Sequence, residues 1–253
     1  MLNRQFCSAA SSVATDKVLY NRRNPYVLEA VLNKEKALNA LDSDMIASLT
    51  ANVEQWNKDP TLRVIVMRGT GKKAFCAGGD VKTLYDARVA EKNPNVRPEV
   101  LDSFFRSEFT VDFKLASMKP LQVALWDGIV MGGGVGVSIH APFRIATENS
   151  HFAMPEAKIG LFTDVAGGYF LSRLKDNLGL YLGLTSSSLK GKDLVRAGVA
   201  NYYIPSERIE ELTKRLYDNP KPEGLTKVGI AETISSLAEP VEGEIANSAA
   251  IKR

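Results

Sequence analysis

The segment WDGIVMGGGVG, residues 126–136, decides the fold, because it places a run of glycines shortly after an apolar strand. Residues 122–126 read as the strand, and the glycines open what reads as a helix. A helix N-terminus presents unpaired N–H groups that stabilise developing negative charge. The dinucleotide fingerprint G-x-G-x-x-G is not met, because Val137 follows Gly132 and Gly134 at its third position. A dinucleotide-binding fold is therefore set aside.

Strands and helices alternate on both sides of this segment. Apolar runs at 27–32 and 63–68 predict strands, and the helix between them is expected to start at Asp42 as its cap. A second helix is expected over 100–117, and two more strands over 143–146 and 151–154. Beyond Asp164 the residue pattern predicts mainly helices. The pattern predicts an α/β fold, with a spiral sheet core over 16–175 and a helical region over 176–253.

The composition limits the classes of function that the chain can have. The 253 residues are 45% hydrophobic and 24% charged, enough for one large core, and no window approaches the roughly 18 apolar residues of a membrane span. A net charge of +3 with no basic stripe gives no support to direct nucleic-acid binding. Two cysteines cannot build a disulfide framework. With only two histidines, no metal site is expected, and carboxylates must carry any acid–base chemistry.

The first fifteen residues resemble a leader segment. They hold Arg4, several Ser and Ala, and no acid before Asp16, so residues 1–15 are predicted to be a mitochondrial transit peptide. The alternative is a tail of ordinary composition.

A second glycine segment, AFCAGGDV at 74–81, follows the strand predicted at 63–68. Paired glycines let the backbone bend sharply and let a ligand approach an exposed N–H, although an ordinary turn would explain the octapeptide taken alone. If the two glycine segments converge, their N–H groups form an oxyanion hole, which an acyl-transfer or enolate intermediate requires.

A third segment, FAMPEAKIGLFTD at 152–164, holds two carboxylates in apolar surroundings. Partial desolvation would raise the pKa of Glu156 and suit it to proton transfer or nucleophilic attack. Two structural alternatives stay open: Asp164 as the N-cap of a helix starting near Val165, and Glu156 as a solvated loop residue.

A serine-hydrolase site is also weighed, since Ser138 and His140 lie close together. The pattern G-x-S-x-G fails at Gly136–His140, and residues two apart on a helix do not face each other. His140 is therefore expected to be packed or half-buried.

Taken together, the chain resembles the crotonase superfamily, and within it the 3-hydroxyisobutyryl-CoA hydrolases. The resemblance runs from KALNAL at 36–41 to NYYI at 201–204. Its most specific marks are FCAGGD at 75–80, MGGGVG at 131–136, FAMPE at 152–156 and GLFTD at 160–164. It implies a crotonase-like spiral of ββα units followed by a helical C-terminal region.

The resemblance also implies roles for individual residues. The amides of Gly79 and Gly133 would hold the thioester oxygen, and Glu156 would act as nucleophile or general base. Asp164 would bind the substrate hydroxyl or assist proton transfer to the departing thiol. Glu108, in FFRSEF at 104–109, would border the acyl pocket. Backbone around Ala37 and Ala77 would lie near the CoA adenine.

The activity so implied is hydrolysis of 3-hydroxyisobutyryl-CoA in valine breakdown in the mitochondrial matrix, without a cofactor, because CoA is part of the substrate. An enoyl-CoA hydratase or isomerase, and a non-catalytic relative associated with the mitochondrial ribosome, are the alternatives. A homo-oligomer stays open.

The chain departs from the family pattern at NKEK (33–36), VAGG (165–168) and LTSSSL (184–189). Family members continue for roughly a hundred residues more, so a truncated C-terminal region is expected.

Overall fold

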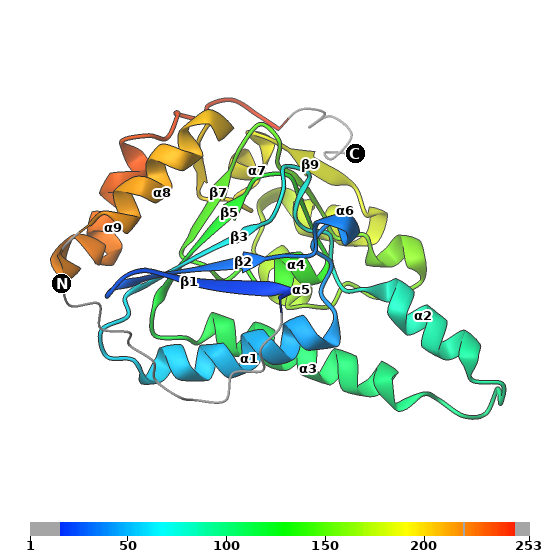
Figure 1. Cartoon of the computed structure of the whole chain (residues 1–253). Coiled ribbons are helices and arrows are strands. Elements are labelled where there is room, and N and C mark those ends of the chain that lie inside the picture. The colour runs from blue at the N-terminus through cyan, green and yellow to red at the C-terminus, as the bar shows by residue number, and fades with distance from the viewer. Residues whose placement is uncertain (1–15, 220, 246–253) are drawn as a thin grey trace.

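The computed structural model describes residues 16–219 and 221–245, so the predicted transit peptide over 1–15 lies outside them. Two sheets lie at the centre, and helices surround them (Figure 1). Within the described ranges, no helix combines the length and apolar character needed to cross a lipid bilayer.

The larger sheet has six strands in the order β1-β2-β3-β5-β7-β10. The antiparallel pair β1/β2 lies at one edge, and every later pairing in this sheet is parallel. Its strands are β1 (Val18–Asn24), β2 (Val27–Leu32), β3 (Val64–Gly69), β5 (Leu121–Trp126), β7 (Phe143–Ala146) and β10 (Tyr202–Tyr203).

The smaller sheet has four strands in the order β4-β6-β8-β9, parallel except for the last pair. They are β4 (Ala74–Cys76), β6 (Ile129–Met131), β8 (His151–Ala153) and β9 (Ser188–Lys190). The chain alternates between the two sheets. The first strand of each consecutive pair lies in the larger sheet and the second in the smaller sheet: β3 and β4, β5 and β6, β7 and β8. The chain therefore winds as the predicted spiral, and the expected α/β fold is confirmed.

Two long helices cover one side of the spiral: α1 (Ser43–Lys58) and α3 (Glu99–Ala116) lie side by side below the sheets in Figure 1. As predicted, Asp42 caps α1, because its side chain accepts a hydrogen bond from the amide of Met45. Between β4 and α3, helix α2 (Val81–Ala90) projects away from the sheets, and only its Leu84 is buried (Figure 1).

Alternate residues of the large sheet enter two different cores, because successive side chains of a strand point to opposite faces. On β3, Ile65 and Met67 face the core shared with α1 and α3. Val64 and Val66 face the opposite core, which α8 (Ile209–Tyr217) and α9 (Lys227–Ser235) complete. Burial on both faces explains why β3 begins as the continuous apolar run VIVM, and why β2 is apolar apart from Glu29.

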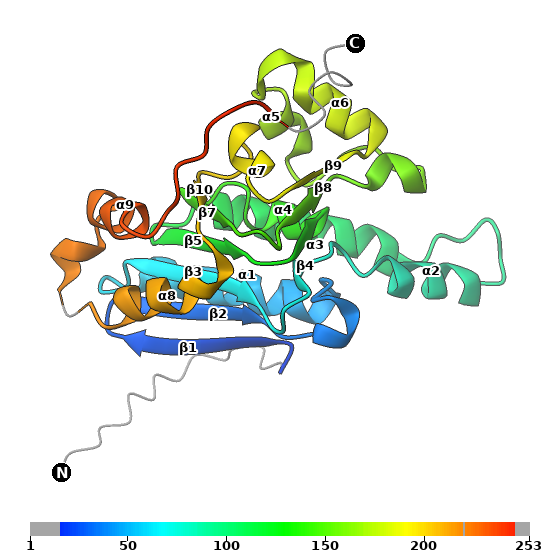
Figure 2. The same ribbon diagram turned by 90° about the horizontal axis from the view of Figure 1, so that it is seen from above.

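The remaining short helices are α4 (Gly133–Gly136), α5 (Gly167–Leu171), α6 (Leu178–Thr185) and α7 (Asp193–Arg196). Figure 2 shows α5, α6 and α7 gathered on one side of the sheets, away from α8 and α9. The region predicted to be helical, 176–253, contains α6 to α9 in its described part, and it also contributes two short strands, because β9 pairs with β8 and β10 pairs with β7. These short runs form strands through pairing with core strands that come earlier in the chain.

Candidate active site

The first glycine segment leaves β4 and ends at Gly79. The amide of Leu41 donates to the carbonyl of Gly78 at 2.8 Å, and the amide of Asp80 donates to the carbonyl of Leu41 at 2.7 Å. These bonds hold the loop on both sides of the Gly79 amide, which makes no hydrogen bond of its own within the described residues. Gly78 has a φ of +112°, a conformation that side chains disfavour.

The second glycine segment leaves β6, the strand beside β4, and opens α4 at Gly133. A methyl group built on Gly133 would lie only 3.2 Å from the amide nitrogen of Gly79. The structure therefore brings the two predicted oxyanion glycines together. The strand order explains this, because β4 and β6 are neighbours and their carboxyl ends meet at one edge of the sheet.

Glu156 enters the same place from β8, the next strand of the sheet. It begins a short 3-10 helix, Glu156–Ile159, and a methyl group built on Gly132 would lie 3.0 Å from its Oε1 atom. Its side chain is buried, and Oε2 finds no hydrogen-bond partner in the described part of the chain. Burial, together with the nearby charge of Asp164, raises the pKa of Glu156 to about 7. The solvated-loop alternative for Glu156 is therefore wrong.

Asp164 is half-buried, and burial raises its pKa. Helix α5 begins only at Gly167 without a side-chain cap, so the alternative of Asp164 as an N-cap is wrong. Val165 and Ala166 follow with φ values of 43° and 64°, two successive non-glycine residues in the left-handed region. The backbone that presents Asp164 is therefore strained.

Glu108 reaches the site from α3. Its carboxyl is 3% exposed, and Oε1 would lie 2.2 Å from a methyl group on Gly133 and 3.4 Å from one on Gly79. Oε1 makes no hydrogen bond to any described residue. Burial first, then the charges of Asp164 and Glu156, raise the pKa of Glu108 to about 8. The predicted acyl-pocket residue thus lies beside both oxyanion glycines.

Asp112, one turn after Glu108 on α3, was missed at the sequence level. Its side chain is buried, and neither carboxyl oxygen has a hydrogen-bond partner in the described ranges. Burial, then Glu108 and Asp164, raise the pKa of Asp112 to about 8. The available signal was its spacing, since Asp112 and Glu108 fall on the same helix stripe as buried Phe104 and Leu115.

The site is strongly acidic: Glu108, Asp112, Glu156 and Asp164 all have raised pKa values. Across residues 16–219 and 221–245, no group of histidine, cysteine and acidic side chains is arranged to hold a metal ion.

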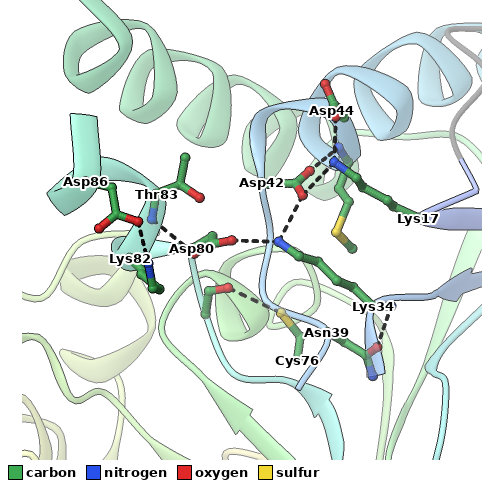
Figure 3. Close-up of polar contacts among 12 residues, drawn as sticks. Lys17, Lys34, Asn39, Asp42, Asp44, Cys76, Asp80, Lys82, Thr83 and Asp86 are labelled. Carbon is green, nitrogen blue, oxygen red and sulfur yellow. Dashed lines mark hydrogen bonds and ion pairs between the residues drawn. The ribbon is translucent and has the colours of Figure 1, made fainter. Parts of the chain in front are cut away.

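A network of charged side chains fixes the end of the loop that carries Gly79 (Figure 3). The ammonium of Lys34 bridges Asp42 at 2.9 Å and Asp80 at 2.6 Å. These two acids cap α1 and α2 respectively. Because Asp80 directly follows Gly79, the ion pairs anchor the oxyanion loop to the start of α1.

The two segments predicted to lie near the CoA adenine are adjacent. Ala37 ends a short 3-10 helix, Glu35–Ala37, and the amide of Ala77 donates to the carbonyl of Leu38 at 3.0 Å. Ala37 and Ala77 are both half-buried. Their role with CoA stays a prediction.

Ser138 and His140 form no catalytic pair. The hydroxyl of Ser138 is buried, donates to the carbonyl of Gly134 at 2.7 Å, and accepts from the indole of Trp126 at 3.0 Å. His140 packs against the ring of Tyr169, with centroids 5.5 Å apart. Ser138 therefore ties α4 to β5, and the serine-hydrolase alternative has no structural support.

These groups together can stabilise charge on an acyl oxygen and place a carboxylate beside the same carbon. The Gly79 amide lies beside Gly133, the Glu108 carboxyl lies next to both glycines, and the Glu156 carboxyl lies next to Gly132. Such an arrangement suits enolate chemistry and acyl transfer alike.

Comparisons with known proteins agree with this geometry. The sequence profile described as Enoyl-CoA hydratase/isomerase matches residues 27–253. A mitochondrial 3-hydroxyisobutyryl-CoA hydrolase of Dictyostelium discoideum is 42% identical over 217 residues, covering 85% of this chain and 57% of that protein. The Mus musculus protein of the same name is 45% identical over 202 residues, covering 80% and 51%. The chain thus spans about half the length of these relatives.

Solved structures show the same fold. A carnitinyl-CoA dehydratase from Mycobacterium thermoresistibile superposes with a TM-score of 0.80 at 30% identity, covering 94% of this chain and 65% of that one. An enoyl-CoA hydratase from Rhodobacter sphaeroides 2.4.1 gives 0.76 at 29% identity, with the same coverage. The spiral of two sheets, the paired glycine loops and these matches agree, and the chain belongs to the enoyl-CoA hydratase/isomerase family of the crotonase superfamily.

Proposed function

We propose that this chain hydrolyses the thioester of 3-hydroxyisobutyryl-CoA to 3-hydroxyisobutyrate and CoA, as a step of valine breakdown. Relatives that carry this name are 42–45% identical over most of the chain. The observation that carries the proposal is the meeting of the Gly79 amide, Gly133 and the buried Glu156 carboxyl at one edge of the small sheet.

In the proposed reaction, the amides of Gly79 and Gly133 bind the thioester oxygen and stabilise the negative charge that it gains in the transition state. Each such donor typically contributes about 3 kcal/mol. Glu156 acts in its ionised form by one of two routes. It either attacks the carbonyl carbon to form a mixed anhydride that water then cleaves, or it takes a proton from a water that attacks directly.

In both routes the carbon–sulfur bond breaks and its electron pair goes to sulfur. Asp164 is suited to protonate the departing thiolate, because burial raises its pKa and favours its protonated form. Glu108, whose pKa is raised to about 8, is placed to donate its proton to an oxygen of the acyl group beside Gly133.

The test mixes the purified chain with 3-hydroxyisobutyryl-CoA and a thiol-detecting reagent. Wild type should release CoA, and Glu156→Gln should abolish release. Glu207→Gln is the matched control, because Glu207 is an exposed glutamate away from the site. Release by Glu156→Gln at the wild-type rate would reject the assigned mechanism.

One measurement separates the two routes. In a single turnover in heavy-oxygen water, the direct route places the label in the released acid. The anhydride route can instead leave the label in the Glu156 carboxylate, where mass spectrometry of the protein detects it.

A hydration reaction is the second candidate, because the carnitinyl-CoA dehydratase structure is 30% identical to this chain, and two acids lie at neighbouring glycines, Glu108 at Gly133 and Glu156 at Gly132. Two carboxyl groups at one site could take a proton from an attacking water and deliver a proton to the other carbon of a double bond. Loss of the enoyl absorbance of crotonyl-CoA, without release of CoA, would favour this candidate over hydrolysis.

The proposal also covers the cellular location, the cofactor requirement and the oligomeric state of the chain. Relatives are named mitochondrial, which supports the mitochondrial matrix as the location. The reaction as written needs an acyl-CoA substrate and no cofactor. Cell fractionation tests the location, and light scattering tests whether the chain forms a homo-oligomer. Co-sedimentation with mitochondrial ribosomes, without CoA release, would favour the non-catalytic alternative.

A further inference from the structure

Asp112 lies against the end of α4 that is remote from the oxyanion amides. A methyl group built on Gly136, the last residue of α4, would lie 2.6 Å from Oδ2 of Asp112 and 2.7 Å from Cβ of Val165. Glu108 makes the equivalent contact with Gly133, the first residue of α4. Two acids one turn apart on α3 therefore lie along the glycine face of α4.

Helix α3 buries these acids although apolar residues are available beside them. Asp112 is 5% exposed and Glu108 is 3% exposed, whereas Phe113 and Phe109 are 72% and 40% exposed. The same face of α3 buries Phe104, Val111 and Leu115, so the packing of these apolar side chains carries the two acids into the interior. The hydrophobic effect accounts for the burial of those three side chains but not for the burial of the two carboxyl groups.

Within residues 16–219 and 221–245, the charged groups that act on Asp112 are acids, and none of them is a cation. The titratable groups that face it are Glu108 on its own helix, Asp164 on the loop before α5, and the buried thiol of Cys76 on β4. Neither oxygen of Asp112 has a hydrogen-bond partner among the described residues. A carboxylate without a partner is costly to bury, whereas a neutral carboxylic acid is tolerated.

We propose that Asp112 is a positioning residue of the hydrolysis reaction, a neutral acid that supports α4 behind the oxyanion glycines without adding negative charge there. The proposal rests on the proposed function. A thioester oxygen gains negative charge at Gly79 and Gly133, and an anion at Asp112 in the same dry region would oppose that charge. Loss of the Asp112 proton should therefore switch the site off at alkaline pH.

The direct test compares wild type with Asp112→Asn, which keeps the shape of the neutral acid but cannot ionise. Above about pH 8, we expect kcat/KM of wild type to fall because two groups ionise, Asp112 and Glu108. For the variant, kcat/KM should fall because Glu108 alone ionises. The ratio of variant to wild type, corrected for uncatalysed hydrolysis, should then rise by up to about tenfold per pH unit.

Asp102→Asn is the matched control, since Asp102 lies on the same helix but is exposed and pairs with Arg97. Its ratio to wild type should stay flat with pH. A flat ratio for Asp112→Asn as well would overturn the proposal. Asp112→Ala should lose activity at every pH, since the support of α4 is then removed along with the acid.

A second readout needs no substrate. With its pKa raised, Asp112 binds a proton in the folded protein but not in the unfolded chain between about pH 4 and pH 8. Its contribution to stability therefore falls as pH rises through that window. The Tm of Asp112→Asn minus the Tm of wild type should increase over the same pH range. A constant Tm difference would overturn the neutral state of Asp112. Absence of CoA release by wild type would instead overturn the proposed function, while the melting data would still decide the charge of Asp112.

Discussion

Replacing Gly133 with alanine tests the oxyanion site by steric means alone. The added methyl group would lie 2.2 Å from Oε1 of Glu108 and 3.2 Å from the amide nitrogen of Gly79. The carboxyl of Glu108 is an end group but is buried on all sides, and the Gly79 backbone is held by the Leu41 bonds. The methyl group therefore fills the space where the thioester oxygen must sit.

The magnitude follows from the loss of one oxyanion donor, about 3 kcal/mol, which corresponds to roughly two decades in kcat. Overpacking adds a folding cost of about 1–3 kcal/mol, so activity must be measured at a temperature where the variant is folded. The assay is CoA release at saturating substrate, with circular dichroism to confirm folding.

Gly168→Ala is the control, because a methyl group on Gly168 would meet no atom within 4 Å. It should keep its kcat. A Gly133→Ala variant that is folded and within about threefold of wild type would refute the assigned oxyanion site, as would an equal loss in both variants.

Three further predictions follow from the site. Because the pKa of Glu156 is about 7 and the reaction needs its ionised form, kcat/KM should fall about tenfold per pH unit below pH 7, and an acid limb centred near pH 4.5 would contradict this. Ala166→Gly should raise the free energy of unfolding in urea by roughly 0.5–1 kcal/mol, since relief of the left-handed φ exceeds the added entropy of the unfolded chain, and a loss of stability would be inconsistent with strain there. Lys34→Met should lower stability by roughly 1–2 kcal/mol and raise KM, because Asp42 and Asp80 lose their shared cation, and an unchanged urea midpoint and KM would speak against the anchoring role.

Elements with strong local signals could be predicted from the sequence. Helix α1 carries its cap at Asp42 and its apolar stripe within its own residues, and β3 is a β-branched run buried on both faces. Strand β1 was missed because it lies at a sheet edge and is half polar, and α2 because it buries only Leu84. Strands β9 and β10 are two or three residues long and depend on their partners.

The candidate site, like the fold, could be predicted from the sequence only in part. Gly79, Gly133, Glu156 and Asp164 stand in segments whose composition signals chemistry, but their convergence depends on the order β4-β6-β8, which no local pattern contains. Asp112 was missed because an acid on a helix with neighbouring phenylalanines is expected to face water. Only the packing of α3 on α4 shows that the acids of this helix turn inward.

The most direct test of the account is a crystal structure of the Glu156→Gln variant with 3-hydroxyisobutyryl-CoA bound. We expect the thioester oxygen within about 2.7–3.1 Å of the amide nitrogens of both Gly79 and Gly133, with the substituted side chain at position 156 facing the carbonyl carbon. A thioester oxygen that contacts only one of the two amides, or an acyl group bound away from α4, would contradict it.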